Sequence, residues 1–132
     1  MQNLEKKENL IISRPQIQFI SEVEEMTVPR RVRLTKSENG ETGTATFLFF
    51  EPTIFSIFIN SSSQSSICIK NMNLIWDKKK ISTNDIKIYF KDGKPIILRS
   101  ILIFRNSKDW FNFLNFMSCY SKETVLSFTE FK

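Results

Sequence analysis

The sequence predicts an α+β fold: an antiparallel β-sheet meander with a C-terminal α-helix packed on one face, in two layers. Two residue pairs typical of hairpin turns, Asn39-Gly40 and Asp92-Gly93, lie next to segments in which apolar and polar residues alternate. Apolar residues then recur at helical spacing near the C-terminal end. The length of 132 residues fits one domain. We expect a flexible extension over residues 1–14 and a single domain over residues 15–132.

The first part of the domain predicts a short strand at residues 17–19, followed by a hairpin. In residues 31–35 Val and Leu alternate with Arg and Thr, and in residues 44–49 Ala and Phe alternate with Thr and Leu. This period of two is typical of half-buried strands. The Asn39-Gly40 pair predicts a type I′ turn, in which both central residues have positive φ. Gly43 would allow a bulge in the same loop.

The middle of the chain predicts further strands. Residues 53–58 fit either a helical turn or a strand, and residues 61–66 form a polar loop. Three strands of a meander are expected after it, at residues 66–76, 86–91 and 95–104, with a turn at 77–80. A slip in apolar phase near Lys70 predicts a bulge in the first of them. We expect Phe90 to point inward, and the last strand, apolar on both faces, to lie centrally in the sheet.

A C-terminal helix is expected after these strands, with Ser107 as its N-cap and Asp109 at the positive end of its dipole. Its end is expected at residues 121–123, before an apolar-tipped tail over 125–128. The predicted core stripe of the helix consists of Trp110, Phe113, Leu114, Met117 and Tyr120.

Composition argues against most catalytic chemistry. The chain has no histidine, which excludes Ser–His, Cys–His and His–metal sites. We interpret the two cysteines, Cys68 and Cys119, as buried reduced thiols. No phosphate-binding loop, dinucleotide loop or nucleophile elbow is present. An enzyme would need a carboxylate or lysine with a shifted pKa in a pocket, such as Asp85 or Asp109. We therefore expect a binding protein without catalytic residues, cofactor or metal.

The net charge of +5 permits an anionic partner. Lys78-Lys79-Lys80 fits a solvated hairpin tip, or alternatively a phosphate or lipid-headgroup contact. Residues 30–36 form the denser basic cluster, in which alternation places Arg31 and Arg33 on one strand face. That cluster fits a polar sheet face and, equally well, a docking site in which arginines hold carboxylates or phosphates. No apolar run reaches the length of a membrane-spanning helix.

The predicted hairpin resembles a family signature. It is similar to that of the photosystem II assembly factors known as the Psb protein numbered twenty-eight, formerly grouped as PsbW-type. The resemblance extends over about residues 16 to 130 and is more specific in the first half. Basic residues at 78–80 and Asn71, where the family has acidic residues and glycine, depart from it. The residues that carry it are Ile17-Gln18-Phe19, Val28-Pro29, Val32 to Ser37, Gly40, Gly43 to Phe47, Phe49 and Pro52, and more loosely Met72 to Leu74, Phe90, Gly93 to Pro95, Trp110, Phe113, Phe116, Met117, Tyr120, Leu126 and Phe128.

The resemblance implies a non-catalytic photosystem II assembly factor without a cofactor. Such proteins attach peripherally to the thylakoid membrane, on its stromal side in plastids or its cytoplasmic side in cyanobacteria. Their implied partners are photosystem II core proteins, especially PsbB and reaction-centre subunits, in immature complexes. No nucleic acid is then expected, although a nucleic-acid-binding module using Arg30 to Lys36 is the alternative. The expected partner-binding residues are Arg33, Thr35, Lys36, Thr44, Thr46, Leu126 and Phe128.

Overall fold

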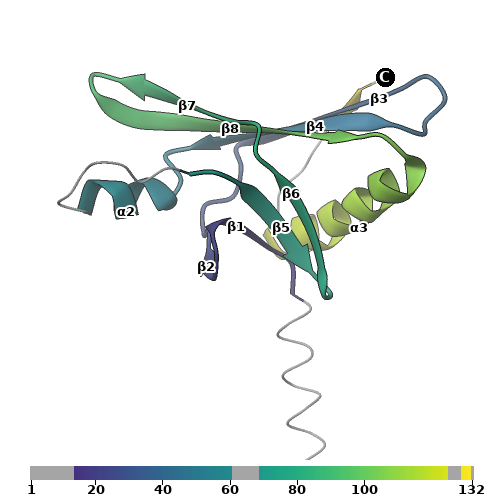
Figure 1. Ribbon diagram of the computed structural model, residues 1–132, viewed down its shortest axis with the longest axis horizontal. Helices are drawn as coiled ribbons and strands as arrows, with labels where there is room; N and C mark the ends of the chain where they lie inside the picture. Colours follow the sequence, from purple (N-terminus) through teal and green to yellow (C-terminus); the bar gives the residue numbers. More distant parts are fainter. Residues whose placement is uncertain (1–13, 61–68, 125–128, 132) are drawn as a thin grey trace, which may run out of the picture.

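The computed structural model describes residues 14–60, 69–124 and 129–131 (Figure 1). Two helices lie in these ranges, α2 (Ile54–Asn60) and α3 (Ser107–Thr124). The strands are β1 (Gln16–Ile20), β2 (Val23–Glu24), β3 (Arg31–Lys36), β4 (Gly43–Phe50), β5 (Met72–Trp76), β6 (Lys79–Thr83), β7 (Ile86–Lys91), β8 (Lys94–Phe104) and β9 (Thr129–Phe131).

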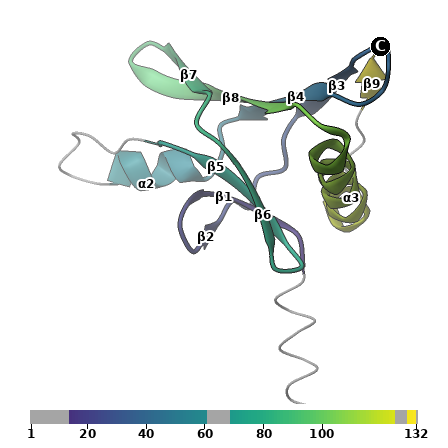
Figure 2. The same ribbon diagram turned by 45° about the vertical axis from the view of Figure 1, so that its right-hand side comes forward.

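The strands form two sheets. One has five strands in the order β7-β8-β4-β3-β9, and the other has four in the order β2-β1-β5-β6. The five-stranded sheet lies along the top of Figures 1 and 2, with α3 and the four-stranded sheet beneath it. We call its lower side the inner face and its upper side the outer face. The predicted α+β class with the helix on one sheet face is confirmed, while the second sheet and the parallel β3–β9 pair were not predicted.

The core lies between the inner face and the layer below it. The Phe113 ring of α3 lies 6.1 Å from that of Phe47 on β4 and 4.8 Å from that of Phe104 on β8, between ring centroids. On its other side, α3 contacts the second sheet through Phe116, whose ring is 5.1 Å from Trp76. Each buried ring contributes about 2–3 kcal/mol through the hydrophobic effect. Helix α3 therefore joins the two sheets into one packed unit.

The β3–β4 hairpin has the predicted strands, but its turn differs. The two strands pair without a register shift up to Lys36 and Gly43, so the bulge expected near Gly43 is not present. Gly40 has a φ of 73°, whereas Asn39 is not among the described residues with positive φ. The last hydrogen bond before the turn runs from the Ser37 amide to the Thr42 carbonyl (3.0 Å). Four residues lie between these two, whereas a type I′ hairpin turn has two, so the type I′ prediction was wrong. The Asn39 side-chain oxygen instead accepts from the Glu41 amide at 3.0 Å. Loops of this length are most often built on type I turns.

Two other turns have positive φ at both central residues, as type I′ turns require. Asp92 and Gly93 have φ values of 54° and 80°, which confirms the second predicted hairpin. Asp77 and Lys78 have 46° and 63° and join β5 to β6, a strand that the sequence analysis missed. The predicted turn over residues 77–80 was too long, because Lys79 and the residue after it already pair with β5.

Two strand details differ from prediction, and a third agrees with it. The apolar phase slip near Lys70 is not a bulge: β5 begins only at Met72, and residues 66–68 of the expected strand lie outside the described residues. Phe90 is 64% exposed instead of inward-facing. A register shift between Tyr89 and Phe90 places Phe90 opposite Pro95, near the hairpin end and beyond the core. The central position of β8, between β7 and β4, is confirmed.

Helix α3 is capped one residue earlier than predicted. The side-chain oxygen of Asn106 accepts from the Asp109 amide at 2.9 Å, and its side-chain nitrogen donates to the Asp109 carboxylate at 3.0 Å. The bond from the Asp109 amide makes Asn106 the N-cap, so Ser107 is not the cap. The buried stripe also includes Phe116, and Leu114 is only partly buried. Cys119 is exposed, contrary to prediction, because it lies on the solvent side of the helix, and Cys68 lies outside the described residues.

Residues 53–58 were predicted as either a helical turn or a strand, and most of them lie in helix α2. The buried carboxylate of Glu25 binds the start of this helix. Glu25 accepts from the Thr53 amide and hydroxyl, both at 2.7 Å, and from the Ile54 amide at 2.9 Å. These bonds satisfy amides at the start of the helix.

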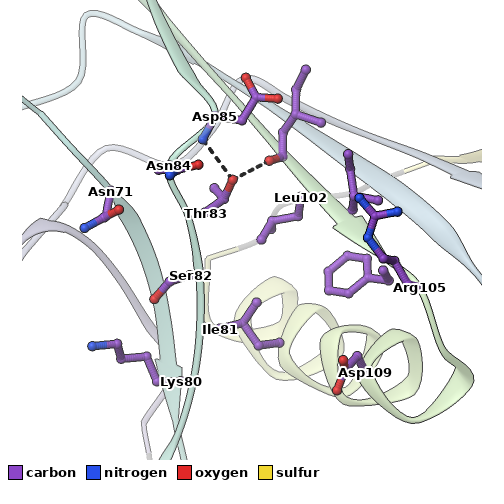
Figure 3. Close-up of a pocket in the computed structure, with 13 residues that line it drawn as sticks. Asn71, Lys80, Ile81, Ser82, Thr83, Asn84, Asp85, Leu102, Arg105 and Asp109 are labelled. Carbon is purple, nitrogen blue, oxygen red and sulfur yellow. Dashed lines mark hydrogen bonds between the residues drawn. The ribbon is translucent and has the colours of Figure 1, made fainter.

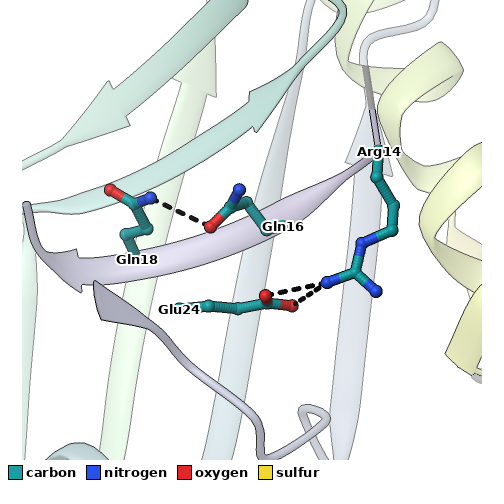
Figure 4. Close-up of polar contacts among 4 residues, drawn as sticks. All are labelled: Arg14, Gln16, Gln18 and Glu24. Atoms are coloured by element: carbon teal, nitrogen blue, oxygen red, sulfur yellow. Dashed lines mark hydrogen bonds and ion pairs between the residues drawn. The ribbon is translucent and has the colours of Figure 1, made fainter. Parts of the chain in front are cut away.

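Near the start of the described chain, Arg14 forms an ion pair with Glu24 (2.9 Å) beside the β1–β2 pair (Figure 4). The expected loop at residues 61–66 lies outside the described residues.

Candidate functional site

The outer face of the β3–β4 hairpin brings four of the predicted partner-binding residues together. Arg33 lies opposite Thr46, and Thr35 lies opposite Thr44, in the antiparallel register. Because strand side chains alternate, these residues point away from the buried residues that lie between them. The arginine and Thr35 are exposed, and the other two threonines are half-buried.

The remaining predicted residues are placed differently. Lys36 is opposite Gly43 at the end of the hairpin, and alternation puts it out of phase with the outer face. Leu126 and Phe128 lie outside the described residues. The strand that follows them, β9, pairs in parallel with β3 through Arg33 and Thr129.

The outer face continues across β8 and β7. Thr44 is opposite Ile103, Leu48 is opposite Arg99, and Arg99 is opposite Lys87. No described element lies above this face in Figure 1, and Ile103 is 54% exposed. These positions on β8 and β7 were not predicted as part of the site. The apolar residues on both faces of β8 were a signal, but they were interpreted only as a sign of a central strand.

Positive charge dominates these strands. Strands β3, β7 and β8 contain lysine or arginine, and neither they nor β4 contain aspartate or glutamate. Three cations lie close to aromatic rings: Arg30 is 4.5 Å from the Phe50 centroid, and Lys87 and Arg99 are 5.5 and 5.9 Å from the Tyr89 centroid. Such contacts position a cation without neutralising it. The face is therefore suited to an anionic partner.

A cleft of about 690 Å³ lies between β6, β8 and the start of α3 (Figure 3). Asp85 and Asp109, the carboxylates considered for an enzyme, both line it. Figure 3 shows them at opposite ends of the cleft, and Asp109 is already bonded to Asn106. At the upper end, Thr83 donates to the Ile101 carbonyl at 2.6 Å and accepts from the Asp85 amide at 3.1 Å. These carboxylates do not form an acid–base pair.

The described residues provide neither a metal site nor a membrane-spanning helix. No group of three or more cysteine, aspartate or glutamate side chains in the described ranges could hold a metal ion. Within the same ranges, no helix is both long and apolar enough to cross a bilayer.

Comparison with known proteins identifies the family. A family model described as "Psb28 protein" matches residues 17–128, which include the hairpin, the outer face and α3. The chain belongs to the Psb28 family. The resemblance drawn from the signature hairpin is thereby confirmed.

Several Psb28 proteins of other organisms are similar over most of their length. The "Photosystem II reaction center Psb28 protein" of Cyanidium caldarium is 38% identical over 112 residues, which are 85% of this chain and 95% of that protein. The protein of the same name from Rippkaea orientalis is 40% identical over 115 residues, 87% and 95% of the two chains. That from Guillardia theta is 40% identical over 116 residues, 86% and 94%.

The structure also explains one glycine of the signature in this Psb28 chain. A Cβ atom at Gly43 would lie 2.8 Å from the Thr35 carbonyl oxygen and 2.8 Å from two ring atoms of Trp110. Only a residue without a side chain lets the indole pack against the start of β4. Gly43 thus fixes helix α3 beneath the hairpin that carries the candidate site.

Proposed function

We propose that the chain is a non-catalytic photosystem II assembly factor, which docks transiently on immature complexes containing PsbB. The observation that carries the proposal is the family match over residues 17–128, together with relatives named as photosystem II reaction center proteins. The outer face supports it, because it is uncovered by any described element and rich in cations. The protein acts peripherally at the thylakoid membrane, on its stromal side in a plastid or its cytoplasmic side in a cyanobacterium.

The hairpin face provides the first contact. Arg33 can hold a carboxylate of a core subunit with two parallel hydrogen bonds. The hydroxyls of Thr35, Thr44 and Thr46 offer further donors and acceptors on a backbone fixed by the sheet, so that little ordering entropy is lost on binding. Lys36 at the hairpin end extends the positive field, and Leu126 and Phe128 supply an apolar contact. PsbB and reaction-centre subunits are the partners in this scheme.

The free edge of β7 offers a second mode of contact. Strand β7 is the end strand of the five-stranded sheet. Its outer backbone groups can pair with an extended segment of a partner. Face and edge contacts are compatible, because they use different groups of the same sheet.

Native-gel separation of solubilised thylakoid complexes tests the proposal. We expect the protein to comigrate with immature photosystem II complexes that contain PsbB and to be absent from mature ones. Arg33→Glu should reduce this comigration severalfold, whereas Lys108→Glu, the same charge change on the exposed side of α3, should leave it unchanged. If the wild-type protein never comigrates with immature complexes, the proposed function is wrong.

The competing function is a small nucleic-acid-binding module that uses Arg30 to Lys36. The acid-free strands β3, β4, β7 and β8 favour it, because phosphate backbones bind cationic surfaces. It requires an affinity for RNA or DNA that falls steeply with salt. An absence of mobility shift at low salt eliminates this function.

A further inference from the structure

The β7 end of the outer face carries two rows of side chains that the proposed hairpin contact does not use. The first row is cationic: Lys87, Arg99 and Arg31 lie in register across β7, β8 and β3, with Leu48 of β4 between the last two. The second row is apolar: Tyr89 is opposite Ile97, which is opposite Phe50. We call these seven residues the β7–β8 platform.

Arg99 stands at the centre of the platform and has an unmet hydrogen bond. Its Nε atom is buried and has no acceptor among the described residues. Its guanidinium lies 5.9 Å from the Tyr89 ring centroid, which holds it in place without accepting a strong hydrogen bond. A buried donor without an acceptor is unfavourable. If the guanidinium turns outward from its present position, a carboxylate from another molecule on the platform would supply the acceptor.

The second row gives the ligand an apolar part. Tyr89 is 38% exposed and Phe50 is 39% exposed, and Ile97 between them is half-buried. Exposed aromatic residues beside arginine are typical of the centre of protein–protein interfaces. The platform therefore fits a ligand with both acidic and apolar groups.

The spacing of the charges favours a polypeptide over a membrane surface. Lys87 and Arg99 are held beside the same ring, and they stand on neighbouring strands, which lie about 4.8 Å apart. Two cations on adjacent strands beside one ring can both contact a single carboxylate of a protein segment. Lipid headgroups diffuse freely and gain nothing from such a fixed spacing.

We propose that an acidic segment of a photosystem II subunit binds across the β7–β8 platform. One of its carboxylates pairs with Arg99 and Lys87, and an adjacent apolar side chain covers Tyr89 and Phe50. The inference rests on the proposed function and adds to it a second contact, separate from Arg33 and the threonines of the hairpin.

The test measures binding of the labelled protein to purified immature photosystem II complexes. Lys87→Glu combined with Arg99→Gln should weaken binding at least tenfold, and Tyr89→Ala should weaken it severalfold. The matched control, Lys108→Glu with Lys122→Gln on α3, makes the same change in net charge and should stay within twofold of wild type. Lys87→Glu alone changes one exposed side chain and serves if the double variant does not fold. A carbodiimide, which joins lysine amines to carboxylates, should link Lys87 to an aspartate or glutamate of a photosystem subunit.

The outcomes separate this inference from the proposed function. If Arg33→Glu abolishes binding while the platform variants bind like wild type and Lys87 forms no cross-link, the inference falls and the proposed function stands. If the wild-type protein binds no immature complex, both fall. Vesicles of phosphatidylcholine with phosphatidylglycerol provide the last comparison. If the platform variants bind these vesicles more weakly than wild type but bind the complexes equally well, the platform binds lipid and the inference is overturned.

Discussion

Replacing Gly43 by alanine tests how helix α3 is seated against the sheet. The added Cβ would stand 2.8 Å from the Thr35 carbonyl oxygen and 2.8 Å from atoms Cη2 and Cζ3 of Trp110. Real Cβ atoms do not approach heavy atoms so closely, so that either the indole or strand β3 must shift. The carbonyl belongs to backbone in the register of the hairpin, where Thr35 pairs with Thr44. Neither neighbour can turn away as a flexible side-chain end would.

We expect Gly43→Ala to lower the free energy of unfolding by about 2–3 kcal/mol, the upper part of the range for overpacked sites. For a domain of this size the loss corresponds to a fall in Tm of roughly 5–10 °C. Urea denaturation followed by tryptophan fluorescence measures it. Near-ultraviolet circular dichroism should also change, because Trp110 moves.

A double-mutant cycle with Trp110→Phe separates the clash from other effects. Phenylalanine lacks the second ring that the new Cβ would meet, so that Gly43→Ala should cost at least 1 kcal/mol less in that background. Gly40→Ala is the matched control: it has open space but a φ of 73°, and its cost of about 1 kcal/mol should not depend on Trp110. A cost of Gly43→Ala below about 0.5 kcal/mol, or one that is equal in both backgrounds, would refute this account.

Three further predictions follow from buried or capping groups. Asn106→Ala should destabilise the protein by about 1 kcal/mol in urea denaturation, and Ser107→Ala by clearly less; the reverse order would contradict the observed cap. Glu25→Ala should lower the free energy of unfolding by about 2–3 kcal/mol and speed hydrogen exchange of amides at the start of α2, because these amides lose a charged acceptor. Unchanged exchange there would argue against this role. Burial, with smaller contributions from Glu25 and Glu24, raises the pKa of Tyr120 above its usual value. The unfolded chain therefore releases this proton near pH 10 while the folded chain keeps it, so that stability should fall as pH rises above about 10, by up to 1.4 kcal/mol per pH unit. Tyr120→Phe should flatten that slope in denaturation at pH 9 to 11, and an unchanged slope would show that other groups cause it.

Local patterns predicted the parts of the fold that local interactions determine. The alternation in residues 31–35 and 44–49 gave both strands and their buried faces, and Asp92-Gly93 gave a true two-residue turn. Asn39-Gly40 misled, because turn type depends on loop length as well as on the residue pair. Strand β6 was not predicted, because its first two residues are lysines and were assigned to a turn. Backbone pairing with β5 stabilises this strand whatever its side chains are.

Long-range pairing could not be predicted in the same way. Nothing in the sequence near Arg99 shows that it lies opposite Leu48, about fifty residues away. The hairpin part of the candidate site was therefore predicted from alternation and from the family signature. The β7–β8 platform could not be predicted, because it depends on the pairing of β8 with β4 and with β7. Phe90 was misjudged for a related reason: the register shift beside it follows from how two strands meet, not from either strand alone.

The parallel strand at the edge of the five-stranded sheet has a consequence for how the chain folds. Strand β9 pairs with β3 through Arg33 and Thr129, so this contact closes a loop of nearly one hundred residues. Contacts of such high order form slowly. During synthesis β3 can pair with β4 early but keeps its other edge open until residues 129–131 leave the ribosome. An unpaired edge invites association with other strands. Slow translation near the end of the message would lengthen the time in which the nascent chain is prone to aggregate.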